Sequence, residues 1–138
     1  MKARVRWIEG RSFLGVSESG HSVVMSASPA GENLGPSPMQ LLLLGLGGCS
    51  SYDVVNILEK MRQEVTDCEV LIEAERADDA PRVFTRIKVR FIVTGKNLDA
   101  EKVQRAVALS AEKYCSATIM LGKTAEITQD IEIREAAI

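Results

Sequence analysis

Two cysteines in similar settings are the residues of this chain best suited to do chemistry. Cys49 follows two glycines, Cys115 follows a tyrosine, and each precedes a serine in a stretch whose pattern predicts helix. Small neighbours let other atoms approach a sulfur closely. A thiolate is a nucleophile that oxidises reversibly to a sulfenic acid and then to a disulfide. The pair therefore indicates thiol redox chemistry, with packing of two thiols as the alternative.

The two cysteines suit different steps of such chemistry. Cys49 could attack the O–O bond of a hydroperoxide, and Cys115 could then close a disulfide with it. A helix start at Cys49 would lower its pKa, whereas Asp53, one turn later, would oppose thiolate formation. A Cys49 pKa well below about 7 would indicate an enzyme, and one near or above the free value of about 8.5 would favour packed thiols. Cys68 lies in an alternating strand pattern and is expected to pack.

Few other residues suggest a site. Arg11, in a Glu-Gly-Arg turn, is a candidate to hold a thiolate and orient a peroxide, although many turn arginines are simply solvated. His21 is the only histidine and the cysteine spacing fits no zinc motif, so we expect no metal site and no cofactor. Ser50 and Ser51 have no nearby base and are predicted to be serines on a helix face.

The bulk composition narrows the class of protein. The 138 residues suit a single domain over 1–138, and the net charge of -2 argues against nucleic-acid binding. The longest apolar run, from Met39 to Cys49, is about half of the ~20 residues that cross a bilayer. The N-terminal residues have no apolar core of signal-peptide length. We therefore expect a cytoplasmic protein without membrane partners.

Apolar periodicity predicts the elements that must position these residues. Residues 26–38 read as a loop, Ser37-Pro38 as a helix start, and Asp99 as a helix cap. The pattern predicts strands at 3–8, 12–16 and 22–25, a helix at 39–64, strands at 67–76 and 82–94, helices at 99–114 and 116–121, and a strand at 125–134. The order β-β-β-α-β-β-α-α-β is that of an α+β domain.

Three glycines interrupt the first predicted helix just before Cys49. Gly45, Gly47 and Gly48 each cost roughly 0.5–1 kcal/mol relative to alanine in a helix interior. They predict either close backbone packing or a local break that would let Cys49 begin a new helix. The surrounding segment is apolar on all sides, which predicts a buried helix.

Several motifs together resemble the OsmC/Ohr family, and within it the small YhfA-like branch. They are Ser-Pro-Met-Gln-Leu at 37–41, Gly-Gly-Cys-Ser at 47–50, Asp-Val-Val-Asn at 53–56, Pro-Arg-Val-Phe-Thr at 81–85, and Glu-Lys-Tyr-Cys-Ser at 112–116. The resemblance runs over nearly the whole chain. It implies an OsmC-like fold with antiparallel sheets around two buried central helices, in an intertwined homodimer with active sites at the interface.

The same resemblance implies thiol-dependent reduction of organic hydroperoxides. Cys49 would attack the peroxide, Cys115 would resolve the intermediate, and a dithiol would supply the electrons. Arg11 matches the family's arginine by strand register, but Met39 stands where the family has a glutamate, which leaves Asp53 or Glu112 as substitutes. Two alternatives remain, a non-catalytic dimer that binds a small apolar or thiol-bearing ligand and a redox sensor.

Overall fold

The chain folds into the predicted order of strands and helices, with one additional turn. The structure is a computed structural model that describes residues 1–137. It divides into two compact units, Met1–Leu44 and the residues from Gly45 onward, and each is described here by itself. The expectation of a single domain over the whole chain stays a prediction.

The N-terminal unit contains the three-stranded meander that the sequence predicts. Strands β1 (Ala3–Glu9), β2 (Ser12–Ser17) and β3 (Ser22–Ser26) pair in that order, and both pairs are antiparallel. The turns between them use Gly10 and Gly20, which adopt positive φ angles of 53° and 86°. The hydroxyls of Ser12 and Ser26 lie 2.9 Å apart in the buried part of this sheet.

Helix α1 (Pro38–Lys60) begins where the sequence indicates and runs through the three glycines without a break. At its start, the backbone N–H of Gln40 donates to the Ser37 hydroxyl (3.1 Å), and the side-chain carbonyl of Gln40 accepts from the backbone N–H of Ser37 (2.9 Å). This reciprocal pair is a capping box. Because the helix is continuous, the hypothesis that Cys49 begins a new helix is wrong.

Close packing explains one of the glycines. A Cβ at Gly47 would lie 2.9 Å from the Ile72 side chain of strand β4 (Glu64–Arg76), so α1 packs closely on the sheet at this point. Within the described chain, a Cβ at Gly45 or Gly48 would meet no atom within 4 Å. These two glycines lie on an exposed side of the helix.

Only one face of α1 is buried within the single chain, so burial of its other sides, which the expected homodimer would provide, stays a prediction. Every fourth residue from Leu46 to Leu58 is buried, and this row comprises Leu46, Ser50, Val54 and Leu58. Large apolar residues are exposed elsewhere along the helix, namely Leu42, Leu44 and Tyr52. By length and composition alone α1 could span a membrane, a property that core helices share. Its buried row shows that one face of the helix packs within the chain.

The second unit is built on a mixed three-stranded sheet. Strand β4 begins at Glu64, three residues before the predicted start, and pairs antiparallel with β5 (Phe84–Lys96). Strand β6 (Glu126–Glu135) pairs parallel to β5. The expectation of purely antiparallel sheets is therefore wrong for this pair. The chain must return from the end of β5 to the start of β6, and a helical crossover makes that connection.

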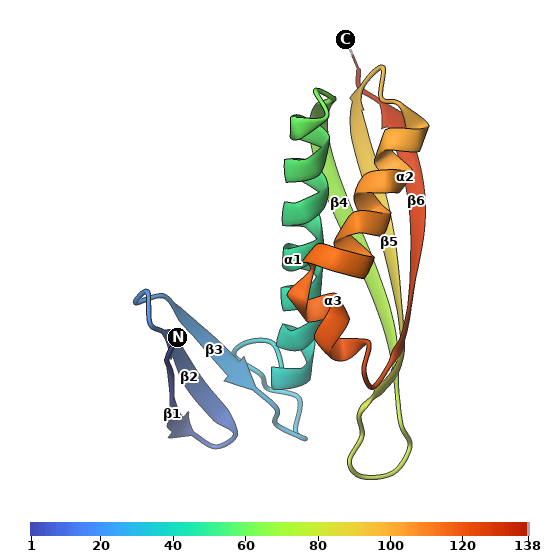
Figure 1. Cartoon of the computed structure of the whole chain (residues 1–138). Helices are drawn as coiled ribbons and strands as arrows, with labels where there is room; N and C mark the ends of the chain where they lie inside the picture. Colours follow the sequence, from blue (N-terminus) through green and yellow to red (C-terminus); the bar gives the residue numbers. More distant parts are fainter. Residues whose placement is uncertain (138) are drawn as a thin grey trace. The chain divides into compact units, whose positions relative to one another are not determined.

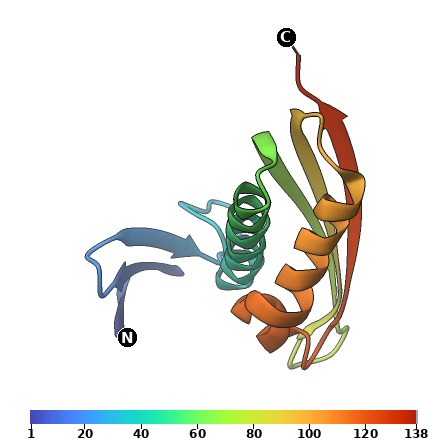
Figure 2. The ribbon, with the colours of Figure 1, turned by 45° about the horizontal axis from the view of Figure 1, so that its top comes forward.

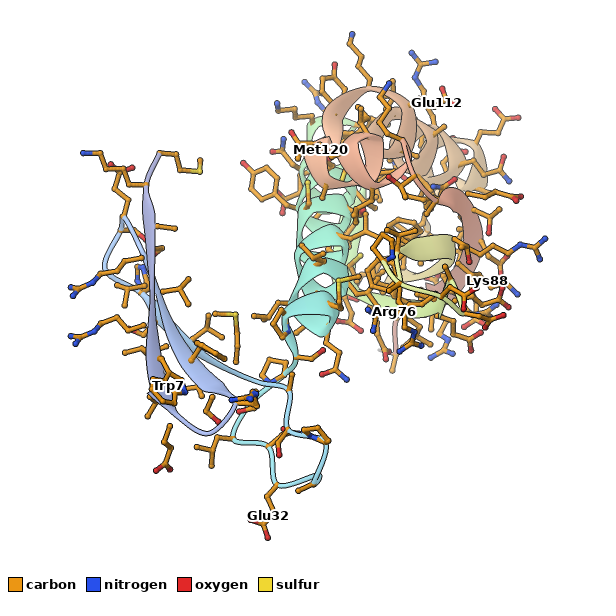
Figure 3. All side chains as sticks on the ribbon, turned by 90° about the horizontal axis from the view of Figure 1, so that it is seen from below. Trp7, Glu32, Arg76, Lys88, Glu112 and Met120 are labelled. Atoms are coloured by element: carbon orange, nitrogen blue, oxygen red, sulfur yellow. The ribbon has the colours of Figure 1, made fainter. Side chains whose placement is uncertain are left out.

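The helices of this unit all cover the same face of the sheet (Figures 1 and 2). Val89, Phe91 and Val93 of β5 alternate toward the helices and are buried. Lys88 projects to the side of the sheet away from α1 (Figure 3). The outer face is thus charged, and Arg90 there bonds Asp130 and Glu132, each at 2.7 Å.

The crossover contains a widened turn that the sequence does not reveal. Helix α2 (Ala100–Leu109) is capped by Asp99, whose carboxylate accepts from the Glu101 N–H at 3.0 Å, as predicted. It continues into a π-helical turn, η1 (Ser110–Tyr114), in which the Cys115 N–H donates to the Ser110 carbonyl at 2.8 Å. Helix α3 (Ser116–Leu121) follows at once. The predicted single helix to Tyr114 is thus an α-helix followed by a π turn.

Candidate functional site

The two cysteines, 66 residues apart in the sequence, meet in the second unit. One ligand atom each from Cys49, Asp53 and Cys115, namely two sulfurs and a carboxylate oxygen, lie within 4.8 Å of one another. Cys49 and Asp53 are four residues apart on α1, so they share one face of that helix. Cys115 lies at the junction of η1 and α3. The fold therefore brings the predicted pair together and adds Asp53.

Cys115 is fully buried and held by hydrogen-bond donors. Its extended backbone caps α3, and its sulfur accepts from the Thr118 N–H at 3.4 Å. The Ser50 hydroxyl also lies 3.4 Å from this sulfur. Burial alone would raise the pKa of Cys115, but the hydrogen bonds from Cys49, Ser50 and Thr118 outweigh it and lower the pKa. The thiolate of the pair is therefore favoured at Cys115.

Cys49 has the opposite character. It is half-buried and lies near the middle of α1, not at its start. Burial, the hydrogen bond with Cys115, and the negative charges of Cys115 and Asp53 together raise the pKa of Cys49 and outweigh a hydrogen bond from the Ala117 N–H, which lowers it. The predicted lowering of its pKa by a helix start is therefore wrong in this structure. Cys49 is the more accessible thiol and Cys115 the more acidic one.

Serine and threonine hydroxyls fix the surroundings of the pair. The Ser110 hydroxyl donates to the Asp53 carboxylate at 3.0 Å. Ser110 is the first residue of η1, so the π turn that ends before Cys115 also positions this donor. The Ser50 hydroxyl lies 3.4 Å from the Thr118 hydroxyl, which joins α1 to α3 beside the Cys115 sulfur.

The roles of these hydroxyls were not predicted from the sequence, although two of them carry a signal there. Ser50 was predicted to be a serine on a helix face with no role in the site. It is instead buried, in the same row of α1 as Leu46, Val54 and Leu58. Ser110 continues the buried stripe of α2, which consists of Val103, Ala106 and Val107. A polar residue in an otherwise apolar buried row needs a partner, and this rule points to both serines.

The remaining predicted residues lie elsewhere. Arg11 donates to the Gly10 carbonyl at 3.0 Å and lines a hollow of about 590 Å³ in the N-terminal unit, so its pairing with Cys49 stays a prediction. Cys68 lies half-buried on β4, and burial, with a smaller effect of Asp67, raises the pKa of its thiol. This environment fits the expected packing role of Cys68.

The cluster is also a set of metal-ligand atoms. Two thiols and one carboxylate from three places in the sequence converge within 4.8 Å. The expectation of no metal site rested on the single histidine, His21, and on the spacing of the cysteines along the chain. Neither can show a carboxylate brought in by the fold.

Comparisons with known proteins agree with this architecture. A family model described as OsmC-like protein matches residues 31–130. Protein YhfA of Escherichia coli K12 is 52% identical over 96% of this chain and 98% of its own length. A solved structure of a hypothetical protein from Aquifex aeolicus VF5 is 26% identical, with a TM-score of 0.87 over 99% of this chain and 97% of that one.

A third protein shares the fold at lower identity. The organic hydroperoxide resistance protein OhrB of Bacillus subtilis is 23% identical, with a TM-score of 0.67 over 96% of this chain and 98% of that one. The family match covers most of the chain, and the similarity to YhfA extends over nearly all of it. This chain therefore belongs to the OsmC-like protein family.

Proposed function

We propose that this protein is a cytoplasmic thiol-dependent peroxidase that reduces organic hydroperoxides through Cys49 and Cys115. The observation that carries the proposal is the meeting of an accessible thiol and a buried, more acidic thiol within 4.8 Å. The shared fold with an organic hydroperoxide resistance protein supports the choice of substrate class. A reducing compartment keeps such a pair in the dithiol form between turnovers.

The reaction divides into two steps with a sulfenic acid between them. The Cys49 thiolate attacks one peroxide oxygen, so an S–O bond forms, the O–O bond breaks, and the alkoxide leaves with a proton as the alcohol. The Cys115 thiolate then attacks the Cys49 sulfur, so the disulfide forms and hydroxide leaves with a proton as water. An external dithiol reduces the disulfide by exchange and is itself oxidised to a disulfide.

The first step requires Cys49 to lose its proton. The Cys115 thiolate and the Asp53 carboxylate both lie within 4.8 Å and can receive that proton. Glu112, the other acidic substitute, lies on η1. Arg11 takes the role that the family resemblance assigns, in which its guanidinium holds the Cys49 thiolate and orients the peroxide. A cation near Cys49 would offset the effect of burial on the Cys49 pKa.

The assembly is proposed to be a homodimer. The exposed side of α1 presents Leu44 and Tyr52, which are 62% and 70% exposed, beside Gly45 and Gly48. A second copy would bury these apolar residues, and the glycines would let its backbone approach closely. Sedimentation should give a dimer for the wild type and a monomer for Tyr52→Glu. A monomeric wild type would contradict this assembly.

A second candidate is a redox-sensing or small-ligand-binding dimer without turnover. The raised pKa of Cys49 favours it, because a thiol that stays protonated reacts slowly with peroxides. Met39, in the first turn of α1 where the family has a glutamate, favours it as well. A sensor would form the Cys49–Cys115 disulfide once, without continued consumption of peroxide.

One assay separates the two candidates. Reduced wild type, Cys49→Ser, Cys115→Ser and the control Cys68→Ser are each incubated with cumene hydroperoxide and excess dithiol, and peroxide consumption is followed. The peroxidase proposal expects turnover in the wild type and Cys68→Ser and none in Cys49→Ser. Equal slow consumption by wild type and Cys49→Ser refutes it. Disulfide formation without turnover, seen as a loss of two hydrogens by mass spectrometry, identifies the sensor.

A further inference from the structure

We propose that reduced Cys49, Asp53 and Cys115 form a binding site for a thiophilic divalent cation, with Zn²⁺ as the ion that fits best. The inference goes beyond peroxide chemistry and requires only that both thiols are reduced. It rests on the convergence of two sulfurs and a carboxylate oxygen within 4.8 Å.

The spacing of the three ligand atoms is close to that of a tetrahedral zinc site. Zinc binds sulfur at about 2.3 Å and carboxylate oxygen at about 2.0–2.2 Å, which places neighbouring ligand atoms roughly 3.5–3.8 Å apart. Three atoms that already lie within 4.8 Å of one another need only small side-chain movements to reach this geometry. Cys49 and Asp53 are half-buried, so their side chains have room to adjust and the ion has a route from solvent.

The partners of these ligands are those that a metal site uses to hold its ligands in place. The Ser110 hydroxyl donates to the Asp53 carboxylate at 3.0 Å and leaves its other oxygen free for a metal. The Thr118 N–H fixes the Cys115 sulfur at 3.4 Å. Cys115 is thus anchored from α3, while Cys49 and Asp53 approach from one face of α1.

The donor set selects the class of ion. Two thiolates and one carboxylate suit zinc and cobalt, whereas magnesium and calcium require mostly oxygen ligands. Three protein ligands leave the fourth tetrahedral position to water, as in zinc sites with an open position. Metal and peroxide would compete for the Cys49 sulfur, so an occupied site would block peroxide attack at Cys49.

Cobalt reports directly on this arrangement. Reduced full-length protein is titrated with Co²⁺ under anaerobic conditions, and the sulfur-to-cobalt charge-transfer absorption is followed; Zn²⁺ is then added to displace the cobalt. We expect one cobalt per chain in the wild type and in Cys68→Ser, which retains both site thiols. Cys49→Ser and Cys115→Ser should lose most of the absorption.

Asp53→Asn is the decisive variant, because it preserves shape and both thiols. We expect it to weaken metal affinity at least tenfold, and Ser110→Ala to weaken it roughly tenfold through the lost hydrogen bond to Asp53. Glu59→Gln, an exposed carboxylate on the same helix, is the matched control and should bind as the wild type does. Circular dichroism confirms that each variant is folded.

Two results would overturn the proposal. One is the absence of charge-transfer absorption at one equivalent of cobalt, and the other is an unchanged affinity in folded Asp53→Asn. The titration needs no hydroperoxide. A protein that binds cobalt but turns over no peroxide therefore refutes the peroxidase proposal alone, and a peroxidase that binds no cobalt refutes this one alone.

Discussion

Removing the Ser50 hydroxyl tests why Cys115 is the more acidic thiol. In Ser50→Ala, the Cys115 sulfur loses a donor that lies 3.4 Å away, while its bond from the Thr118 N–H remains. The thiolate is then less stable relative to the thiol. The pKa of Cys115 is therefore expected to rise.

The size of the effect follows from one hydrogen bond. A hydrogen bond to a charged group contributes about 1.5–3 kcal/mol, and a 3.4 Å contact belongs at the low end. The Ser50 hydroxyl has one proton and also lies 3.4 Å from the Thr118 hydroxyl, so it serves the sulfur only part of the time. Since 1.36 kcal/mol is tenfold in an equilibrium constant, the acid dissociation constant of Cys115 should fall roughly threefold to tenfold.

The measurement is made with Cys115 as the only thiol. The chain has three cysteines, so the background carries Cys49→Ala and Cys68→Ala, and thiolate ultraviolet absorbance is titrated against pH. Ser51→Ala is the matched control, because that hydroxyl donates to the Gly47 carbonyl at 2.7 Å and not to a sulfur. If Ser50→Ala titrates at the same pH as the Ser51→Ala control, the hydroxyl does not stabilise the thiolate, and the hydrogen-bond account of Cys115 is refuted.

Two further predictions concern stability. Gly95→Ala should lower the free energy of unfolding by about 2–3 kcal/mol, since its Cβ would lie 2.2 Å from the backbone carbonyl oxygen of Glu64; an unchanged urea midpoint would contradict this close packing. The hydrogen bonds and charges of Arg134 and Arg90 lower the pKa of Glu132 despite some desolvation. The ionised carboxylate therefore stabilises the fold fully above the unfolded pKa of about 4.3. This contribution is lost as the pH falls through the lower pKa of the folded state. Glu132→Gln should therefore lose less stability on acidification than the wild type, and parallel losses in urea unfolding would count against the ion pair.

Local signals in the sequence predicted the elements well. Alternation of apolar residues identified both long strands, and Ser37 and Asp99 marked helix starts that the structure confirms through their capping hydrogen bonds. These features depend on residues only a few positions apart, so a pattern in the sequence is enough to predict them. The same holds for the buried stripe of α2, where the spacing of Val103, Ala106 and Val107 fixes the inner face.

Features that depend on distant contacts were harder to predict. A strand pattern for 125–134 does not state which neighbour it joins or in which direction, so the parallel pairing of β6 was missed. The pKa of Cys49 depends on Cys115 and Asp53 together, and the sequence could weigh only the nearer residue. The apolar residues around α1 likewise predict that the helix is buried, but they do not indicate whether the same chain or another copy covers it.

The widened turn at Ser110–Tyr114 makes the site depend on how one turn is wound as well as on which residues it contains. Each residue of an α-helix turns the chain by about 100°. Wound as a regular α-helix, the same residues would turn Cys115 by about that angle further around the axis and away from α1, with Cys49, Asp53, Ser50 and Thr118 all still present. Two relatives can therefore carry the same cysteines and differ in competence through the winding of this one turn, which a comparison of site residues alone would overlook.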